Sequence, residues 1–232
     1  MSALQALILD FDGVVANSER LHLRAFQQAL ERQASAVTLS DEAYYHRYLG
    51  FDDLGVFKAL GQDAGAPFAP DVLRELLAEK EHRYEALAAA GEMLFSGVPE
   101  FIRAAAARVP LAIASGALTR EIEDVLAAAG LRDCFLAIVG ADQTPHSKPA
   151  PDLYLEAFAR LQAAVGRALS PRHTVAIEDS HWGLESARAA GLRTVAVTNT
   201  YPAAALSAHA ELVVEDLGTL DLAALDRLCE PG

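Results

Sequence analysis

Short apolar runs that alternate with helical segments constrain the fold of this 232-residue chain more than any other feature. After Gly91 the apolar runs cover residues 111–114, 136–139, 174–177, 194–197 and 212–214, and the helical segments cover residues 100–107, 120–129, 152–161, 184–190 and 220–228. Short runs that are apolar throughout are typical of strands buried on both faces, and intervening helices make such strands parallel. We therefore predict an α/β fold with a doubly wound, Rossmann-like parallel sheet.

The chain before Gly91 has a different pattern. Residues 4–9 form one more short apolar run, which ends abruptly at Asp10 and predicts a central strand of the same sheet. From Ser18 to about Ala90 the apolar residues recur at helical spacing in four segments, without a convincing strand. We expect residues 1–16 and 92–232 to form the α/β core and residues 17–91 to form an all-helical insertion.

The charge balance limits the partners of the chain. It has 19 basic and 32 acidic residues, a net charge of −13, and such a field repels nucleic acid and anionic membrane surfaces. We expect neither as a partner. A phosphorylated metabolite is also repelled at long range, so an anion site here needs a metal ion or local cations.

The cysteines and the N-terminal sequence give an expectation about location. Cys134 and Cys229 are too few for a disulfide framework and lack CxxC spacing. No cationic segment precedes the first apolar run, and no apolar stretch approaches the ~18 residues of a membrane span. We expect a cytoplasmic monomer.

Polar side chains follow several of the apolar runs. In an open parallel sheet, ligands bind beyond the carboxyl ends of the strands, so these residues are the candidates for chemistry. They supply carboxylates, a hydroxyl and an ammonium group, and they are Asp10, Asp12, Ser115, Lys148, Glu178 and Asp179.

Four segments around these residues resemble the motifs of the haloacid dehalogenase superfamily, in the same order. They are Asp10-Phe11-Asp12-Gly13-Val14-Val15, Ser115-Gly116, Lys148-Pro149-Ala150-Pro151-Asp152 and Glu178-Asp179-Ser180. The resemblance covers nearly the whole chain, because residues 17–91 look like the family's inserted four-helix cap domain. It favours the branch of phosphoglycolate phosphatase and β-phosphoglucomutase, and implies a Mg²⁺-dependent phosphatase that acts on a small phosphorylated metabolite.

The resemblance also implies a role for each motif residue. Asp10 would be the nucleophile, because a carboxylate is already ionised at neutral pH and forms an acyl phosphate without a base to activate it. Asp12, which we expect to share the strand face of Asp10, would be the general acid and later the base for water.

The remaining motif residues would hold the metal and the phosphate. Asp10, Asp179 and the main-chain carbonyl of Asp12 resemble an oxygen-rich Mg²⁺ site. Glu178 would either bind the metal directly or contact one of its ligands. Lys148 would supply a positive charge to the phosphate, and Ser115 and Gly116 would supply hydrogen bonds.

Each motif also has a purely structural interpretation. Acidic residues commonly end strands, Lys-Pro-x-Pro-Asp is typical of a rigid turn into a helix, and Ser180 can cap the helix that follows. The four motifs together, each after an apolar run, favour the catalytic interpretation. In the insertion, His22, Gly50 and Asp53 are candidates for substrate specificity, although a single histidine is more often a packing residue.

Three rival functions share part of this pattern. A sugar phosphomutase would need a cation for a second phosphate where Asp53 stands, so hydrolysis is favoured. A haloacid dehalogenase without metal would have no use for Asp12. A non-catalytic receiver domain also has a phosphorylatable aspartate and a lysine, but it is far shorter and lacks the insertion.

Overall fold

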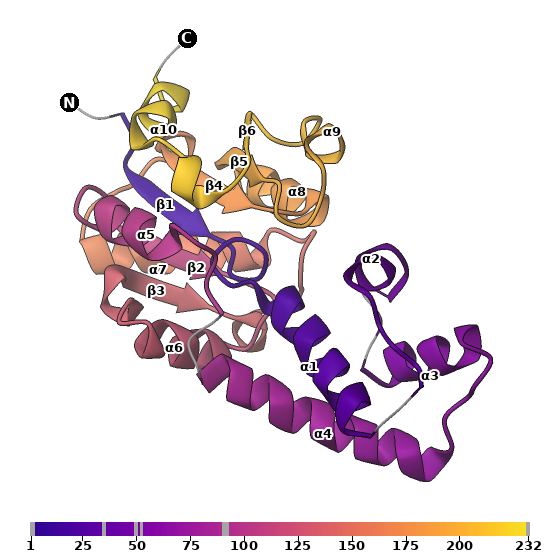
Figure 1. The fold of residues 1–232 in the computed structure, drawn as a ribbon. Coiled ribbons are helices and arrows are strands. Elements are labelled where there is room, and N and C mark those ends of the chain that lie inside the picture. The colour runs from indigo at the N-terminus through magenta and orange to yellow at the C-terminus, as the bar shows by residue number, and fades with distance from the viewer. Residues whose placement is uncertain (1–2, 34–35, 49–50, 52, 90–92, 231–232) are drawn as a thin grey trace. The chain divides into compact units, whose positions relative to one another are not determined.

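The computed structural model describes residues 3–33, 36–48, 51, 53–89 and 93–230. The chain divides into two compact units, one of Met1–Asn17 with Leu94–Gly232 and the other of Ser18–Met93. Among the described residues of the second unit the long elements are helices, whereas the first unit contains a sheet (Figure 1). No helix built from the described residues has the length and hydropathy of a membrane span.

The sheet of the first unit has six parallel strands in the order β3-β2-β1-β4-β5-β6. Their bounds are β1 Ala6–Leu9, β2 Leu111–Ala114, β3 Phe135–Val139, β4 Thr174–Glu178, β5 Arg193–Val197 and β6 Leu212–Val214. The order runs outward in both directions from β1, so this strand is central. The predicted α/β class with a doubly wound parallel sheet is confirmed.

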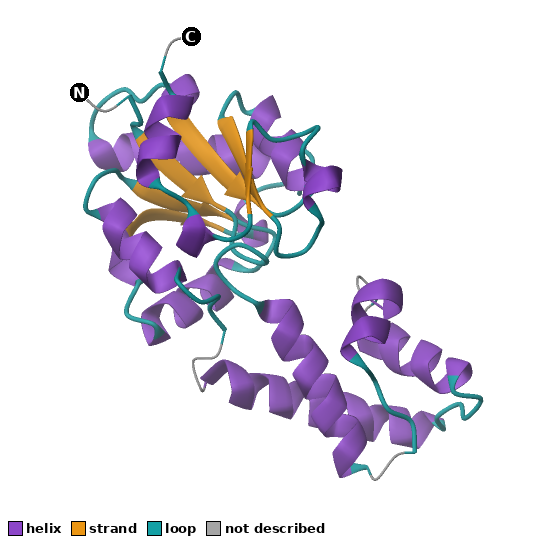
Figure 2. Cartoon of the chain, turned by 45° about the horizontal axis from the view of Figure 1, so that its top comes forward, coloured by secondary structure: helices purple, strands orange, loops and turns teal. Residues whose placement is uncertain are grey.

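Helices cover both faces of the sheet (Figure 2). They are α5 Val98–Ala106, α6 Thr119–Ala128, α7 Asp152–Val165, α8 His181–Ala189, the short α9 Ala203–Leu206 and α10 Leu222–Leu228. Alternate residues of β1 point to opposite faces: Leu7 and Leu9 join the core under α5, α6 and α10, whereas Ala6 and Ile8 join the core under α7. This two-sided burial explains why the strands are apolar without alternation.

The second unit contains α1 Ser18–Arg32, the single turn α2 Asp41–Ala43, a π-helical turn at Tyr44–Tyr48, α3 Asp53–Asp63 and α4 Pro70–Ala89. Its own core includes Phe26 and Phe57, whose rings meet edge to face with centroids 5.1 Å apart. The unit therefore has an apolar centre of its own.

The structure differs from the sequence-based expectation in some local details. Helix α8 begins at His181 rather than near Leu184, because the Ser180 hydroxyl accepts a hydrogen bond from the Gly183 amide at 3.1 Å and caps the helix there. Helix α9 was not predicted. Asp12 does not lie on a strand face with Asp10, because β1 ends at Leu9 and the chain turns tightly afterwards.

Candidate active site

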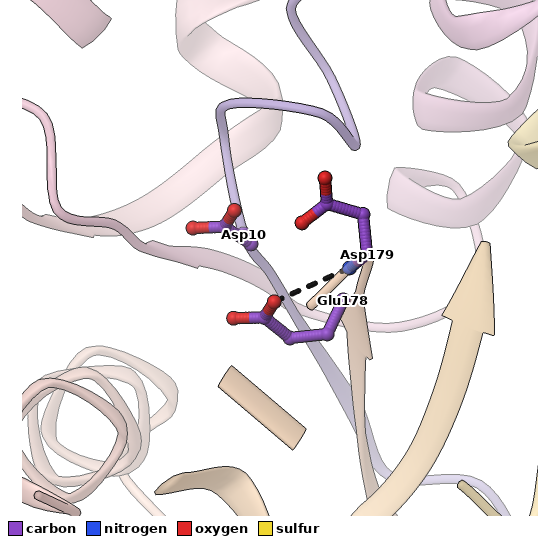
Figure 3. Close-up of side chains that lie close together, drawn as sticks. All are labelled: Asp10, Glu178 and Asp179. Atoms are coloured by element: carbon purple, nitrogen blue, oxygen red, sulfur yellow. Dashed lines mark hydrogen bonds between the residues drawn. The ribbon is translucent and has the colours of Figure 1, made fainter. Parts of the chain in front are cut away.

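Three carboxylates meet at the carboxyl edge of the sheet. Asp10 directly follows β1, while Glu178 ends β4 and Asp179 follows it. Because β1 and β4 are paired with Leu9 opposite Ile177, these side chains extend from neighbouring strand ends (Figure 3). Each contributes an oxygen that lies within 4.8 Å of the oxygens of the other two, and all three residues are buried. The fold therefore brings the segment around Asp10 and the segment around Glu178 and Asp179 together at one edge of the sheet.

Lys148 is the cation of this cluster. Its Nζ lies 2.5 Å from Oδ1 of Asp10 and 2.6 Å from Oε1 of Glu178. The residue lies in the loop between β3 and α7, so a third segment of the chain reaches the same place. The two ion pairs leave three carboxylates opposed by one ammonium group.

Tyr154 supports the lysine and was not predicted as a site residue. Its hydroxyl donates to Oε1 of Glu178 at 2.9 Å, and Nζ of Lys148 lies 5.3 Å from the centre of its ring. The side chain is fully buried in the first turn of α7. Its position just after the Lys-Pro-x-Pro-Asp segment was the one sequence signal that could have pointed to it.

Burial and mutual repulsion shift the pKa values of this cluster. Burial, followed by the repulsion of Glu178, raises the pKa of Asp179 to about 7. Burial also raises the pKa of Asp10 well above its ordinary value, although Lys148 opposes this shift. For Lys148 burial alone would lower the pKa, but Asp10 and Glu178 outweigh it and raise the pKa, so the ammonium stays charged.

Two glycines make room for the carboxylates. A Cβ at Gly13 would collide with the Asp179 carboxylate, and the φ of +78° at Gly13 is in the left-handed region that favours glycine. A Cβ at Gly183, inside α8, would collide with the Glu178 carboxylate. The motif around Asp10 includes Gly13, but the importance of Gly183 was missed, because its only reason is a contact with a residue on β4.

The Glu178 carboxylate is held from several sides. Oε1 accepts from Lys148 and Tyr154, while Oε2 accepts from the Asp179 amide at 3.2 Å and from the Ser180 hydroxyl at 3.1 Å. Figure 3 shows the bond from the Asp179 amide. Glu178 is therefore fixed in orientation, and it in turn fixes Lys148.

Asp12 lies in a tight turn after β1. The Phe11 carbonyl accepts hydrogen bonds from the amides of Val14, Val15 and Ala16, and Asp12 forms an isolated backbone bridge with Ala16. The side chain of Asp12 is not part of the three-carboxylate cluster. The role expected of it in metal binding uses its main-chain carbonyl, so that expectation stays a prediction.

Ser115 and Gly116 follow β2, the neighbour of β1 on the other side. Ser115 is buried, and its hydroxyl accepts from the Ala117 amide at 3.2 Å. Gly116 is exposed, and a Cβ there would meet no atom within 4 Å. Because Leu9 pairs with Ile113, both residues lie at the same sheet edge as Asp10, with open space beside Gly116.

The second unit holds a separate polar cluster. The almost fully buried Lys80 donates to Oδ2 of Asp53 at 2.7 Å and lies 2.8 Å from Nδ1 of His22. Burial, then the Lys80 charge, lowers the pKa of His22 to about 4, so this histidine is neutral. His22 and Asp53 were predicted as specificity residues and do lie together around Lys80, which was missed. Gly50, the third candidate, lies outside the described residues.

The donor set at the sheet edge suits a small divalent cation. Only oxygen ligands are offered by Asp10, Glu178 and Asp179, which matches the preference of Mg²⁺. The excess of carboxylates over ammonium groups, together with the raised pKa values of Asp10 and Asp179, indicates a buried site that lacks positive charge. The residues therefore fit the predicted Mg²⁺.

Comparison with known proteins identifies the family. Residues 4–191 match the family model of haloacid dehalogenase-like hydrolases. The chain therefore belongs to the haloacid dehalogenase-like hydrolase family and is an enzyme of the hydrolase class.

Individual known proteins resemble the chain over most of its length. Protein CbbY of Rhodobacter capsulatus is 34% identical over 203 residues, which cover 85% of this chain and 87% of that protein. Fructose-1-phosphate phosphatase YqaB of Escherichia coli is 28% identical, covering 82% of this chain and 95% of that protein. Among solved structures, a CbbY variant from Rhodobacter sphaeroides in complex with xylulose-(1,5)bisphosphate superimposes with a TM-score of 0.68 at 28% identity, covering 96% of this chain and 99% of that one.

Proposed function

We propose that this protein is a Mg²⁺-dependent phosphatase that hydrolyses a small phosphorylated metabolite through an aspartyl phosphate on Asp10. The observation that carries the proposal is the buried group of Asp10, Glu178 and Asp179 beside the Lys148 ammonium. A buried group of three carboxylates has an energetic cost that a structural role does not repay, and it suits a site for phosphoryl transfer.

In this proposal the carboxyl groups of Asp10 and Asp12 have distinct tasks. One carboxylate oxygen of Asp10 attacks phosphorus, and the bond from phosphorus to the leaving oxygen breaks. Asp12 gives its proton to that leaving oxygen and then takes a proton from the water that hydrolyses the acyl phosphate. Asp10 is regenerated and inorganic phosphate leaves.

The groups around the phosphoryl position provide charge and hydrogen bonds. Lys148 stabilises the negative charge on its oxygens, while the Ser115 hydroxyl and the Gly116 amide hold their orientation. Asp10, Asp179 and the Asp12 carbonyl would hold Mg²⁺, which supplies charge neutralisation between the phosphoryl oxygens and the carboxylates. Glu178 keeps Lys148 in place through the bonds described above.

The organic part of the substrate is a sugar in this proposal. Relatives that act on or bind sugar phosphates are named above, namely a fructose-1-phosphate phosphatase and a protein bound to a xylulose bisphosphate. We assign residues 17–91 as a cap that recognises this part, with His22 and Asp53 as specificity residues. The ion pair of Asp53 with Lys80 neutralises a cation that could otherwise bind a second phosphate, which favours monophosphates.

A phosphate-release assay tests the proposal. The full-length protein is incubated with p-nitrophenyl phosphate and with a panel of small phosphorylated sugars and acids, with Mg²⁺ or with excess EDTA. We expect release with Mg²⁺ and loss of at least most of it in EDTA. Full activity in EDTA would exclude the metal and revive dehalogenase-like chemistry, and a stable phosphoprotein without turnover would indicate a receiver function.

A second assay separates hydrolysis from isomerisation. β-Glucose 1-phosphate is supplied with a bisphosphate primer, and glucose 6-phosphate is measured against free phosphate. We expect free phosphate to dominate, because Asp53 is acidic and is paired with Lys80. Efficient formation of glucose 6-phosphate would identify a mutase instead.

A further inference from the structure

The loop after β5 reaches the carboxylate cluster although no motif includes it. Glu178 on β4 pairs with Ala196 on β5, so the chain that leaves β5 starts beside Asp179. Two polar residues of this loop, Asn199 and Thr200, have their side chains beside the segments that follow β1 and β4.

Both residues contact the site directly. The Asn199 side chain donates from Nδ2 to the Gly13 carbonyl at 2.8 Å, across 186 positions of sequence. The Thr200 hydroxyl acts on the Asp179 carboxylate, because a hydrogen bond from this side chain opposes the rise in the pKa of Asp179 that burial causes. Oγ1 of Thr200 also lies 3.0 Å from where a Cβ of Gly13 would be, so Gly13, Asp179 and Thr200 pack as one group.

We propose that Thr200 is a positioning residue that orients the Asp179 carboxylate for the metal, and that Asn199 holds the Gly13 turn against which this carboxylate packs. The inference rests on the proposed function, since Asp179 is there a metal ligand. A carboxylate can rotate about its own axis, and a hydroxyl bonded to one oxygen directs the other oxygen to the metal. The bare backbone of Gly13 lets the carboxylate sit close, and the Asn199 bond keeps that backbone in place.

The substitution Thr200→Val separates this positioning role of Thr200 from a purely structural one. Thr200 is only partly buried, so replacing its hydroxyl by a methyl group in Thr200→Val keeps the shape of the side chain and little of the core is disturbed. The loss would fall on the orientation of Asp179 and therefore on metal affinity. Such supporting hydrogen bonds are typically worth about 10- to 100-fold in metal affinity.

The test measures binding of Mn²⁺, used as a probe for Mg²⁺, to the metal-free full-length protein by calorimetry. The variants are Thr200→Val, Thr200→Ser, which keeps the hydroxyl, and Thr198→Val. Thr198 is a matched control in the same loop, because its hydroxyl donates to the Glu215 carbonyl at 3.3 Å. Thr200→Ala replaces Thr200→Val if the latter does not fold.

We expect Thr200→Val to weaken Mn²⁺ binding about tenfold or more, while Thr200→Ser and Thr198→Val bind like the wild type. In turnover, the Mg²⁺ concentration for half-maximal rate should rise in Thr200→Val, with kcat at saturating Mg²⁺ largely kept. Wild-type affinity in a folded Thr200→Val would overturn the inference alone. A wild-type protein that binds no Mn²⁺ would overturn it together with the metal site of the proposed function.

Discussion

The ammonium nitrogen of Lys148 lies 2.5 Å from Oδ1 of Asp10, although the two residues are 138 positions apart in the sequence. The lysine therefore contacts the carboxylate that we propose as nucleophile, and it also lies where a phosphoryl group would approach. One cation can thus oppose the rise in the pKa of the nucleophile that burial causes, and balance the charge on the phosphoryl oxygens during the reaction.

Replacing the nucleophile should abolish turnover. In Asp10→Asn the amide nitrogen cannot attack phosphorus, so hydrolysis of p-nitrophenyl phosphate should fall to background while the circular dichroism spectrum is kept. Asp124→Asn is the control, because Asp124 is an exposed residue of α6. Retained turnover in Asp10→Asn would remove Asp10 from its assigned role.

Asp12→Ala should slow turnover by about 10²-fold or more, because the leaving oxygen loses its proton donor. The loss should be larger for a sugar phosphate than for p-nitrophenyl phosphate, since nitrophenolate leaves readily without protonation. The ratio of kcat/KM for the two substrates measures this difference. An equal loss for both would indicate that Asp12 acts through the metal or the turn, and an unchanged rate would make it merely structural.

The metal-free protein should lose stability as the pH rises from about 4 to about 7. Burial and the neighbouring Glu178 raise the pKa of Asp179 from 3.8 to about 7. Between these values the folded protein holds a proton that the unfolded chain has released, so the free energy of unfolding falls with increasing pH. Bound Mg²⁺ should remove this slope and add stability, because it binds the ionised carboxylates of the folded state.

Thermal unfolding from about pH 4 to pH 8, in EDTA and in Mg²⁺, checks this expectation against the pKa window. Asp179→Asn carries no titrating group at this position. In EDTA its unfolding free energy should therefore rise relative to that of the wild type as the pH increases. If the unfolding free energy of the wild type instead rises relative to that of Asp179→Asn over the same pH range, the assigned pKa shift is contradicted.

Removing the Tyr154 hydroxyl should cost both stability and activity. Tyr154→Phe deletes the hydrogen bond to the buried Glu178 carboxylate, and a bond to a charged group is worth about 1.5–3 kcal/mol. Chemical denaturation measures the loss, and Tyr201→Phe, on a partly buried tyrosine of the loop after β5, is the control. A Tyr154→Phe protein as stable and as active as the wild type would show that Lys148, the Asp179 amide and the Ser180 hydroxyl fix Glu178 without Tyr154.

The clash between a side chain at position 183 and Glu178 can be isolated by a double-mutant cycle. Gly183→Ala alone should destabilise the protein, because the new methyl group displaces the Glu178 carboxylate from its donors. In the Glu178→Ala background the same change should stabilise, by up to about 1 kcal/mol, since alanine is the better helix former. Equal effects of Gly183→Ala in both backgrounds would rule out the contact as the cause.

The sequence predicted the parts of this protein that depend on local pattern. Uniformly apolar runs predicted strands such as Leu111–Ala114 with the correct bounds, because strands buried on both faces consist mostly of apolar residues. The convergence of Asp10, Lys148 and Asp179 followed from one rule, that the carboxyl ends of parallel strands share an edge.

What the sequence did not predict depends on contacts between distant segments. Tyr154, Gly183 and Thr200 have ordinary local roles in a helix or loop, and only the position of β4 beside them gives each a carboxylate to bind or to accommodate. Lys80 looked like one more charged residue on a helix, and its burial against Asp53 depends on how α1, α3 and α4 pack.

At position 183 the stability of helix α8 and the space needed by the Glu178 carboxylate favour different residues. Alanine would suit helix α8 better than glycine, yet its Cβ would take the volume in which the Glu178 carboxylate lies. A search for thermostable variants that ignores activity should therefore enrich alanine at 183 together with loss of the acid at 178, and would yield a more stable protein in which Asp10 is left as the carboxylate partner of Lys148.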